Sequence, residues 1–155
     1  MKVTVIGAGY WGPNLIRNFL SHDEVENVVV CDRDESRLAK MRKLFHGIET
    51  ACDYQDVITR DDVEIVAIAT PVSLHYEIAK KSLAAGKHCW IEKPMTVNSA
   101  EAEELIELAE KNNLKIFVDH TFIYTGAVRK MKEIITSGRL GELYYFDSVR
   151  VNLGL

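Results

Sequence analysis

The sequence predicts a doubly wound α/β fold, in which helices cover both faces of a parallel sheet. Two observations support this prediction. Short apolar runs recur along the chain and are nearly continuous in Val, Ile and Ala, as is typical of parallel strands buried on both faces. Segments of helical periodicity separate these runs, and repeated strand–helix–strand units are joined by right-handed crossovers. The strands are predicted at residues 3–6, 27–31, 63–69, 88–91 and 115–118.

The helices between these strands carry recognisable end signals. One helix is expected to begin near Ser73 and to end at Gly86, where a residue with positive φ is favoured. Another is preceded by Asn98, with Glu101 three residues later, a spacing typical of an N-terminal cap. The helix after Asn98 carries an apolar stripe suited to packing on a sheet. The stripe consists of Ala102, Leu105, Ile106 and Ala109.

Length and composition exclude several classes of protein. A chain of 155 residues can build one domain with a sizeable core but not two complete ones. The net charge of −4 leaves no basic surface for nucleic acid, and no apolar stretch approaches the roughly 18 residues that span a bilayer. The 3 cysteines are widely spaced, and no cluster has metal-ligand spacing. We therefore expect a soluble cytoplasmic protein that binds neither metal, nucleic acid nor membrane.

The last part of the chain differs in character from the rest. A helix with an apolar face is predicted to end at Gly138, and an alternating, aromatic-rich stretch at 143–155 predicts a half-exposed strand. That strand has no partner in the sequence, so we expect it to pair with a second copy of the chain in a homo-oligomer. The first domain is predicted over residues 1–122. Residues 123–155 are predicted to be the first helix and strand of a truncated C-terminal α+β domain. The helix presents Val128, Met131, Ile134 and Ile135 on its apolar face.

A glycine-rich turn follows the first predicted strand. Its GxGxxG pattern places Gly7 for a tight turn, Gly9 for close approach to a pyrophosphate and Gly12 for helix–strand packing. The helix N-terminus that follows attracts phosphate charge. Tyr10 and Trp11 would cover the pyrophosphate or pack against the truncated second domain. The pattern and its position predict a Rossmann-type dinucleotide-binding fold, with an empty strand–turn–helix as the alternative.

The residues after the second predicted strand bear on the choice of cofactor. Asp32 lies about 20 residues beyond Gly12, the spacing of a carboxylate that binds the adenosine ribose. A carboxylate there repels a 2′-phosphate and favours NAD over NADP, whereas the adjacent Arg33 favours the phosphate. NAD is the predicted cofactor, with NADP as the alternative.

Two further groups of residues follow predicted strands, at the edge where open α/β sheets bind ligands. Thr70 and Pro71 follow the third predicted strand, with His75 just beyond, and Glu92-Lys93-Pro94 follows the fourth. With these motifs on the expected loops, the whole chain resembles the glucose–fructose oxidoreductase and inositol dehydrogenase family (Gfo/Idh/MocA). The stretch at 9–14 looks most like members that oxidise nucleotide sugars, of the UDP-N-acetylglucosamine 3-dehydrogenase type.

The resemblance implies roles for these loops. Lys93 would hydrogen-bond the substrate hydroxyl and the nicotinamide ribose, and its charge would stabilise a developing alkoxide. Thr70 and Pro71 would line the nicotinamide pocket with Glu92 nearby, and Pro94, often cis in such loops, would aim Lys93 into the cleft. His75 is expected to contact a loop or the cofactor.

The implied activity is NAD(P)-dependent oxidation of a secondary hydroxyl of a sugar or nucleotide sugar. His120 would lie near the substrate and is a second candidate catalytic residue. Asp119 departs from the glycine of many relatives, and no family role is carried over to it. The base in such enzymes is usually a histidine of the second domain, so we expect this chain to bind dinucleotide without turnover.

Three alternatives stay open at this point. The parent enzyme could be a dehydrogenase of a free polyol such as inositol. The chain could instead be a non-catalytic dinucleotide-binding module, such as a redox sensor or regulatory subunit. A domain that binds S-adenosylmethionine or another nucleotide would also accommodate Asp32, although it would leave the Lys93 loop unexplained.

Overall fold

The computed structural model describes residues 1–149 and 151. The chain forms two compact units that meet between Asp119 and His120, and each is described by itself. The first unit contains every strand found in residues 1–149 and 151. Its elements are β1 (Lys2–Ile6), α1 (Gly12–Leu20), β2 (Asn27–Cys31), α2 (Glu35–Leu44), β3 (Glu49–Ala51), α3 (Tyr54–Ile58), β4 (Ile65–Ile68), a 3₁₀ turn (Val72–Leu74), α4 (His75–Ala84), β5 (His88–Glu92), α5 (Ser99–Lys111) and β6 (Ile116–Asp119).

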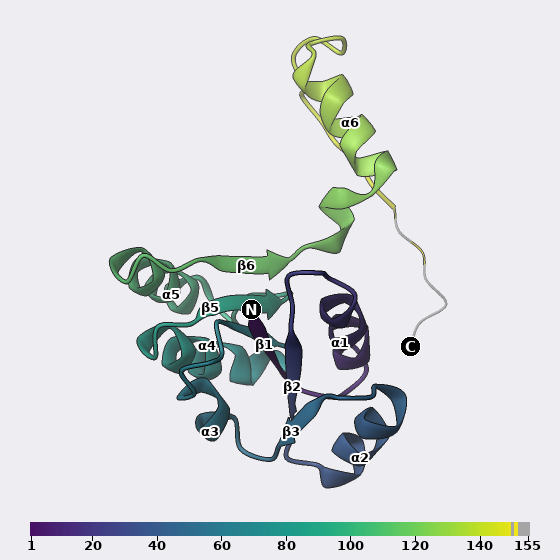
Figure 1. The fold of residues 1–155 in the computed structure, drawn as a ribbon. Coiled ribbons are helices and arrows are strands. Elements are labelled where there is room, and N and C mark those ends of the chain that lie inside the picture. The colour runs from purple at the N-terminus through teal and green to yellow at the C-terminus, as the bar shows by residue number, and fades with distance from the viewer. Residues whose placement is uncertain (150, 152–155) are drawn as a thin grey trace. The chain divides into compact units, whose positions relative to one another are not determined.

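The six strands form one parallel sheet in the order β3-β2-β1-β4-β5-β6 (Figure 1). This is the strand order of a doubly wound dinucleotide-binding sheet, and it confirms the predicted Rossmann-type fold. The five predicted strands are present, although the third is shorter than expected. The remaining strand of the sheet, β3, was not predicted. It is a three-residue edge strand, half-buried throughout and containing Glu49 and Thr50, so it lacks the apolar run that marks the others.

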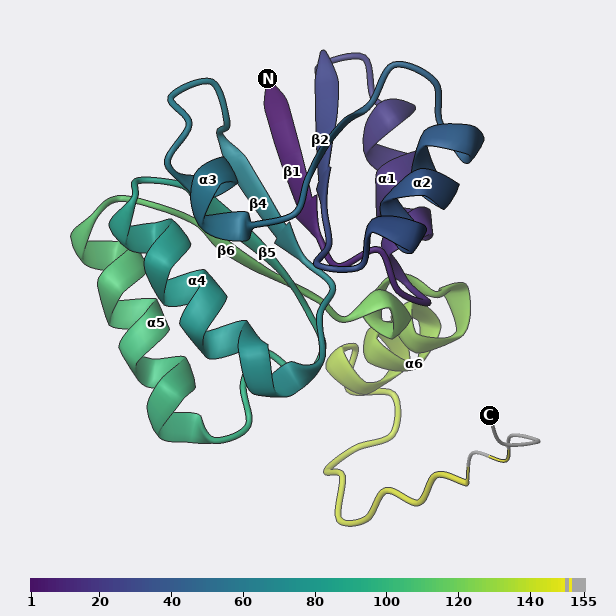
Figure 2. The same cartoon turned by 90° about the horizontal axis from the view of Figure 1, so that it is seen from below.

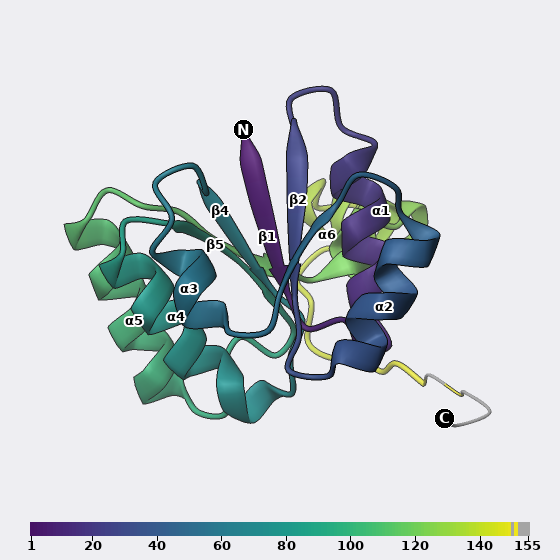
Figure 3. The same cartoon turned by 60° about the horizontal axis from the view of Figure 1, so that its bottom comes forward.

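Helices cover both faces of the sheet (Figures 2 and 3). Helices α1 and α2 lie on one face, and α3, α4 and α5 lie on the other. Each face has its own apolar core, in which a fully buried aliphatic side chain contributes about 1.5–3 kcal/mol. The core beneath α1 and α2 includes Val5, Leu15, Val28, Val30 and Leu38. The core beneath the other three helices includes Val29, Ile68, Leu83, Ile91 and Leu105.

The predicted helix ends are confirmed where they rest on a specific residue. The Asn98 side chain caps α5 by accepting a hydrogen bond from the Glu101 amide at 2.9 Å. Gly86, with φ of 78°, follows α4 in the left-handed region. Asp34 and Asp53 cap α2 and α3 in the same way as Asn98.

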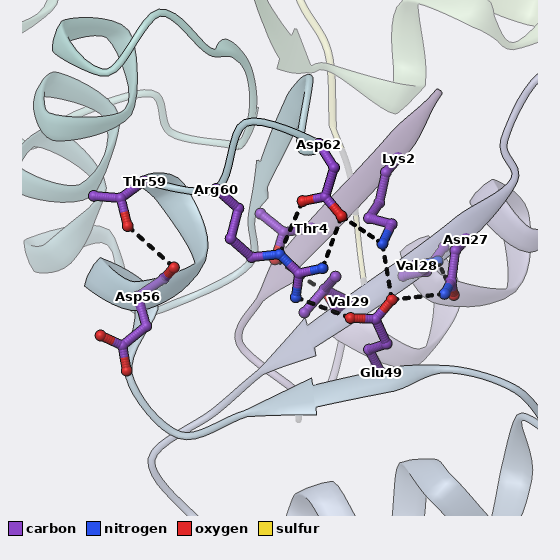
Figure 4. Close-up of polar contacts among 10 residues, drawn as sticks. All are labelled: Lys2, Thr4, Asn27, Val28, Val29, Glu49, Asp56, Thr59, Arg60 and Asp62. Atoms are coloured by element: carbon purple, nitrogen blue, oxygen red, sulfur yellow. Dashed lines mark hydrogen bonds and ion pairs between the residues drawn. The ribbon is translucent and has the colours of Figure 1, made fainter.

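A network of charged side chains joins the N-terminal ends of the strands (Figure 4). Lys2 Nζ lies 2.8 Å from Glu49 Oε1 and 2.7 Å from Asp62 Oδ2. Arg60 donates to both carboxylates, with two parallel hydrogen bonds of 2.9 Å to Asp62 and one of 2.9 Å to Glu49. Asn27 completes the network by donating to Glu49. The network therefore connects β1, β2 and β3 to the segment before β4, at the edge of the sheet opposite the glycine turn.

The second unit consists of a 3₁₀ turn (Thr121–Tyr124), helix α6 (Gly126–Thr136) and the residues that follow. The predicted helix is confirmed, and Gly138 follows it with φ of 70°. The strand expected over 143–155 is wrong for residues 143–149 and 151, which have no strand structure; its other residues lie outside the described part of the chain. A strand needs a partner with which to share backbone hydrogen bonds, and the described residues offer this segment none.

Candidate functional site

The turn between β1 and α1 leaves no room for side chains at two of its three glycines. Gly7 has φ of 103°, and a Cβ there would lie 2.6 Å from the Ala69 carbonyl oxygen. A Cβ on Gly12 would lie 2.1 Å from the Gly7 carbonyl oxygen. A Cβ on Gly9 would meet only the Arg37 side chain, at an ordinary 3.6 Å. Gly7 and Gly12 are therefore required by the protein itself, whereas Gly9 keeps backbone open to an approaching group.

The N-terminus of α1 has the features of an anion site. Pro13 occupies the first turn, no side chain caps the helix, and its first turn holds no acidic residue. The amide groups of this turn and the positive end of the helix dipole therefore point toward the glycine turn without a side-chain acceptor. Tyr10 and Trp11 are 83% and 39% exposed, and their rings stack with centroids 6.4 Å apart.

Asp32 binds the glycine turn from the end of β2. Its Oδ2 accepts a hydrogen bond of 2.8 Å from the Ala8 amide, and Oδ1 accepts one of 2.9 Å from the Asp34 amide. Arg37 of α2 lies 3.4 Å from Oδ2. Arg33, the arginine expected from the sequence to act beside Asp32, is exposed, and Arg37 was not predicted. The sequence pattern that could have pointed to Arg37 is an arginine in the first turn of the helix that Asp34 caps.

His75 joins the other two predicted loops. It is the first residue of α4 and is only 1% exposed. Its Nε2 lies 2.8 Å from the Thr70 carbonyl oxygen, and its Nδ1 lies 2.9 Å from the Pro94 carbonyl oxygen. The structure thus brings Thr70-Pro71 and the Lys93 loop together. His75 contacts both loops, which agrees with the expectation that it contacts a loop.

The Lys93 loop begins at a pair of buried carboxyl groups. Glu92 ends β5 and is 9% exposed, and Asp119 ends β6 and is 7% exposed. The two are register partners in the parallel sheet, so their side chains lie on the same face of neighbouring strands. Burial, as the larger cause, and Asp119 together raise the pKa of Glu92 to about 7. The Lys93 amide and ammonium act in the opposite direction.

This pair was missed by sequence reasoning, which passed over Asp119. The signal that was available is positional. Glu92 and Asp119 each come directly after a predicted strand, and consecutive strands of a parallel sheet that are neighbours place such residues side by side. Lys93 itself is exposed, and its peptide bond to Pro94 is cis, as the resemblance implied.

The three loops share one edge of the sheet. The glycine turn, the Thr70 loop and the Lys93 loop follow β1, β4 and β5, and β1 and β4 are neighbours in the sheet. The strand order reverses between these two, which is where doubly wound sheets bind ligands. His120 is the first residue of the second unit, so the candidate role that it received from sequence stays a prediction. Residues 1–149 and 151 contain no group of three side chains suited to hold a metal ion.

A comparison with known families decides the membership of the chain. Residues 1–120 match the Gfo/Idh/MocA family, described as an oxidoreductase family with an NAD-binding Rossmann fold. The chain belongs to this family. The expectation drawn from the three loop motifs is therefore confirmed.

Individual relatives show the range of the family. The chain is 31% identical to a dTDP-3,4-didehydro-2,6-dideoxy-α-D-glucose 3-reductase of Saccharopolyspora spinosa, over 81% of this chain and 38% of that protein. It is 25% identical to the WlbA dehydrogenase of Chromobacterium violaceum, solved with NADH and UDP-GlcNAcA (TM-score 0.86, covering 93% of this chain and 42% of that one). It is 27% identical to biliverdin reductase of Synechocystis sp. PCC 6803, solved with biliverdin and NADP⁺ (TM-score 0.84, covering 93% and 45%).

These Gfo/Idh/MocA relatives are much longer than the chain, which spans between 38% and 45% of the length of the three. Among the described residues, no helix is both long and apolar enough to cross a bilayer.

Proposed function

We propose that this chain binds NAD(H) across the edge of the sheet formed by β1 and β4, and that its parent is an NAD(P)-dependent sugar oxidoreductase. The observation that carries the proposal is the glycine turn, in which Gly7 and Gly12 admit no side chain while Gly9 leaves open backbone beside an uncapped helix N-terminus. That arrangement fits a pyrophosphate.

The residues of the site fit the rest of the dinucleotide. The Asp32 carboxylate retains lone pairs beyond its two backbone hydrogen bonds and can accept from the adenosine ribose hydroxyls. Toward the other half, Thr70 Oγ1 and Glu92 Oε1 are buried and lack a hydrogen-bond partner within the described residues. Buried polar atoms of this kind normally have a hydrogen-bond partner, so a ligand group at this position would supply the missing partner.

The parent reaction that we propose is the interconversion of a secondary alcohol and a ketone. Bound nicotinamide supplies the chemistry of a hydride acceptor or donor. Lys93 would donate a hydrogen bond to the substrate oxygen and stabilise negative charge developing on it. His120 would lie near the substrate, and the proton acceptor would be a histidine of the substrate domain. Because the relatives devote more than half of their length to other residues, we propose that residues 1–155 alone bind cofactor without turnover.

The substrate class is proposed as a sugar or nucleotide sugar. The Saccharopolyspora reductase and the WlbA dehydrogenase named above act on or bind such molecules, which supports this choice over a free polyol. The biliverdin reductase match shows that the same half of the fold also serves a substrate of another kind. A redox sensor or regulatory subunit is less well supported, because it would not need the exposed Lys93 beside the nicotinamide site.

NAD is the proposed cofactor in preference to NADP. Asp32 carries negative charge where a 2′-phosphate would lie, and the Ala8 amide holds it there. Arg37, 3.4 Å from that carboxylate, and the exposed Arg33 act in the opposite direction. Removal of the Asp32 charge should therefore weaken NAD binding and bring NADP closer to NAD in affinity.

Calorimetric titration of the chain with NAD⁺, NADH and NADPH tests this proposal. We expect NAD(H) to bind, Asp32→Ala to weaken that binding by about 1–3 kcal/mol, and Asp32→Asn to reduce the preference over NADPH. Asp23→Asn removes an exposed carboxylate elsewhere and serves as the control. Failure of every dinucleotide to bind a chain whose melting curve shows it folded would contradict the proposal.

A further inference from the structure

The Glu92–Asp119 pair has an unusual balance of charge for its degree of burial. Glu92 and Asp119 are 9% and 7% exposed, and among the described residues neither forms an ion pair within 4.0 Å. The charged group that acts on Glu92 besides Asp119 is Lys93, from the following loop. Two buried carboxyl groups at register positions of neighbouring strands cannot both ionise without a large cost, and the usual solution is that they share one proton.

The position of this pair relates it to the cofactor. A doubly wound sheet consists of two mononucleotide-binding halves. Asp32 follows β2 and places the adenosine half over β1–β3, so the nicotinamide half falls to β4, β5 and β6. Glu92 and Asp119 end β5 and β6 at the same edge. The unpartnered Glu92 Oε1 and Thr70 Oγ1 show that buried polar atoms of this half are available to a ligand.

We propose that Glu92 and Asp119 hold a shared proton beside the nicotinamide and make the chain distinguish oxidised from reduced cofactor in a pH-dependent manner. The inference rests on the proposed NAD(H) binding. Its physical basis is that the nicotinamide ring is cationic when oxidised and neutral when reduced. The pyrophosphate charge and the Lys93 charge act on both forms alike, so only the ring responds to the charge of the pair.

The direction of the effect follows from the state of Glu92. Burial, together with Asp119, raises the pKa of Glu92 to about 7. Below this pH the pair keeps its proton and carries one negative charge, and above it the pair carries two. Attraction for the cationic ring therefore increases as the pH rises through about 7. By linkage, oxidised cofactor displaces part of the shared proton when it binds, whereas reduced cofactor does not.

Calorimetry at pH 6 and pH 8 measures this difference. We expect the affinity for NAD⁺ to increase about fivefold over this range, a coupling at the low end of the usual scale, while that for NADH changes less than about twofold. At pH 7, titrations in two buffers of different ionisation enthalpy should show proton release with NAD⁺ only. Glu92→Gln should abolish the difference, and Asp119→Asn, which is isosteric, should reduce it, because burial still raises the pKa of Glu92. Glu107→Gln, on the exposed face of α5, is the matched control.

A titration without cofactor tests the pair itself. Side-chain carboxyl ¹³C shifts should show Glu92 titrating near pH 7 in the wild type and moving toward its ordinary value in Asp119→Asn. A wild-type midpoint near that ordinary value would overturn the inference. So would NAD⁺ and NADH affinities with the same pH dependence, and this result would leave the proposed function intact. If neither NAD⁺ nor NADH bound at any pH, the proposed function would be overturned, and the inference with it.

Discussion

Two glycines of the turn after β1 are required by contacts within the protein, and the third is not. Gly7 and Gly12 approach backbone oxygens too closely for a Cβ, at 2.6 Å and 2.1 Å. Gly9 has no such neighbour. At this level the structure separates two glycines that a side chain would crowd from one whose surroundings would admit it.

Alanine substitutions should reproduce this separation. Gly12→Ala should lower the free energy of unfolding by about 1–3 kcal/mol, since the added methyl group overlaps the Gly7 carbonyl. Gly9→Ala should change stability by less than about 0.5 kcal/mol and should still weaken dinucleotide binding. Urea denaturation and calorimetry on the same preparations measure both quantities. A Gly9→Ala chain that binds NAD(H) as the wild type does would show that backbone at this position does not contact the cofactor.

The sequence identified the residues of this site better than it identified their contacts. The spacing of Asp32 predicted its place at the end of β2, but not its hydrogen bond to Ala8, because loop backbone geometry has no sequence signature. His75 was expected to contact a loop or the cofactor, and its bridge between two loops required the tertiary structure. No role was carried over to Asp119 because many relatives have glycine there, and its place beside Glu92 depends on strand register.

At the scale of the element, the charged network holds the N-terminal ends of β1 and β3 and the segment before β4. The pKa of Glu49 is lowered by Lys2 and then by Arg60, and the pKa of Asp62 is lowered by Arg60 and then by Lys2. Exposed ion pairs contribute little singly, but two carboxylates here share two cations. The network therefore acts as one unit that secures the short edge strand.

This network should make stability depend on acidity. Carboxylates with lowered pKa values stabilise the folded state above their unfolded pKa values, and that stabilisation is lost as the pH falls through the folded values. Glu49→Gln should therefore reduce stability at pH 7, whereas wild type and variant should converge near pH 2. Urea denaturation across this range measures the difference, and Glu107→Gln controls for loss of an exposed charge. If Glu49→Gln were less stable than the wild type by the same amount at all pH values, the effect would belong to packing and not to charge.

Elements with continuous apolar runs were predicted, and those without them were not. β1, β2, β4, β5 and β6 follow from their apolar runs, and α5 follows from its cap and stripe. β3 is short and half-buried, so its pairing with β2 depends on tertiary structure. Residues 143–149 alternate as a strand would, yet alternation alone does not form one without a neighbouring strand.

At the scale of the whole molecule, the chain contains a complete doubly wound sheet followed by a second, smaller unit. The division into a dinucleotide-binding domain over 1–122 and the start of a substrate domain over 123–155 stays a prediction. The sheet has the two halves of a dinucleotide-binding fold, and residues 1–120 match the Gfo/Idh/MocA family.

Association of two copies through residues 143–155 also stays a prediction. Tyr144, Tyr145 and Val149 are at least 80% exposed, so the segment presents apolar surface. Light scattering should show a mass that increases with concentration, and a chain ending at residue 142 should remain monomeric. Strictly monomeric behaviour of the full chain at high concentration would contradict the prediction.

We expect a dinucleotide to span the β1–β4 edge, with adenosine over β1–β3 and nicotinamide over β4–β6. Amide chemical-shift mapping of the ¹⁵N-labelled chain during titration with NADH tests this most directly. The perturbed amides should gather in the glycine turn, the loop after β2, the Thr70 loop and the Lys93 loop. Perturbations confined to the opposite edge, around Lys2 and Asp62, would contradict it.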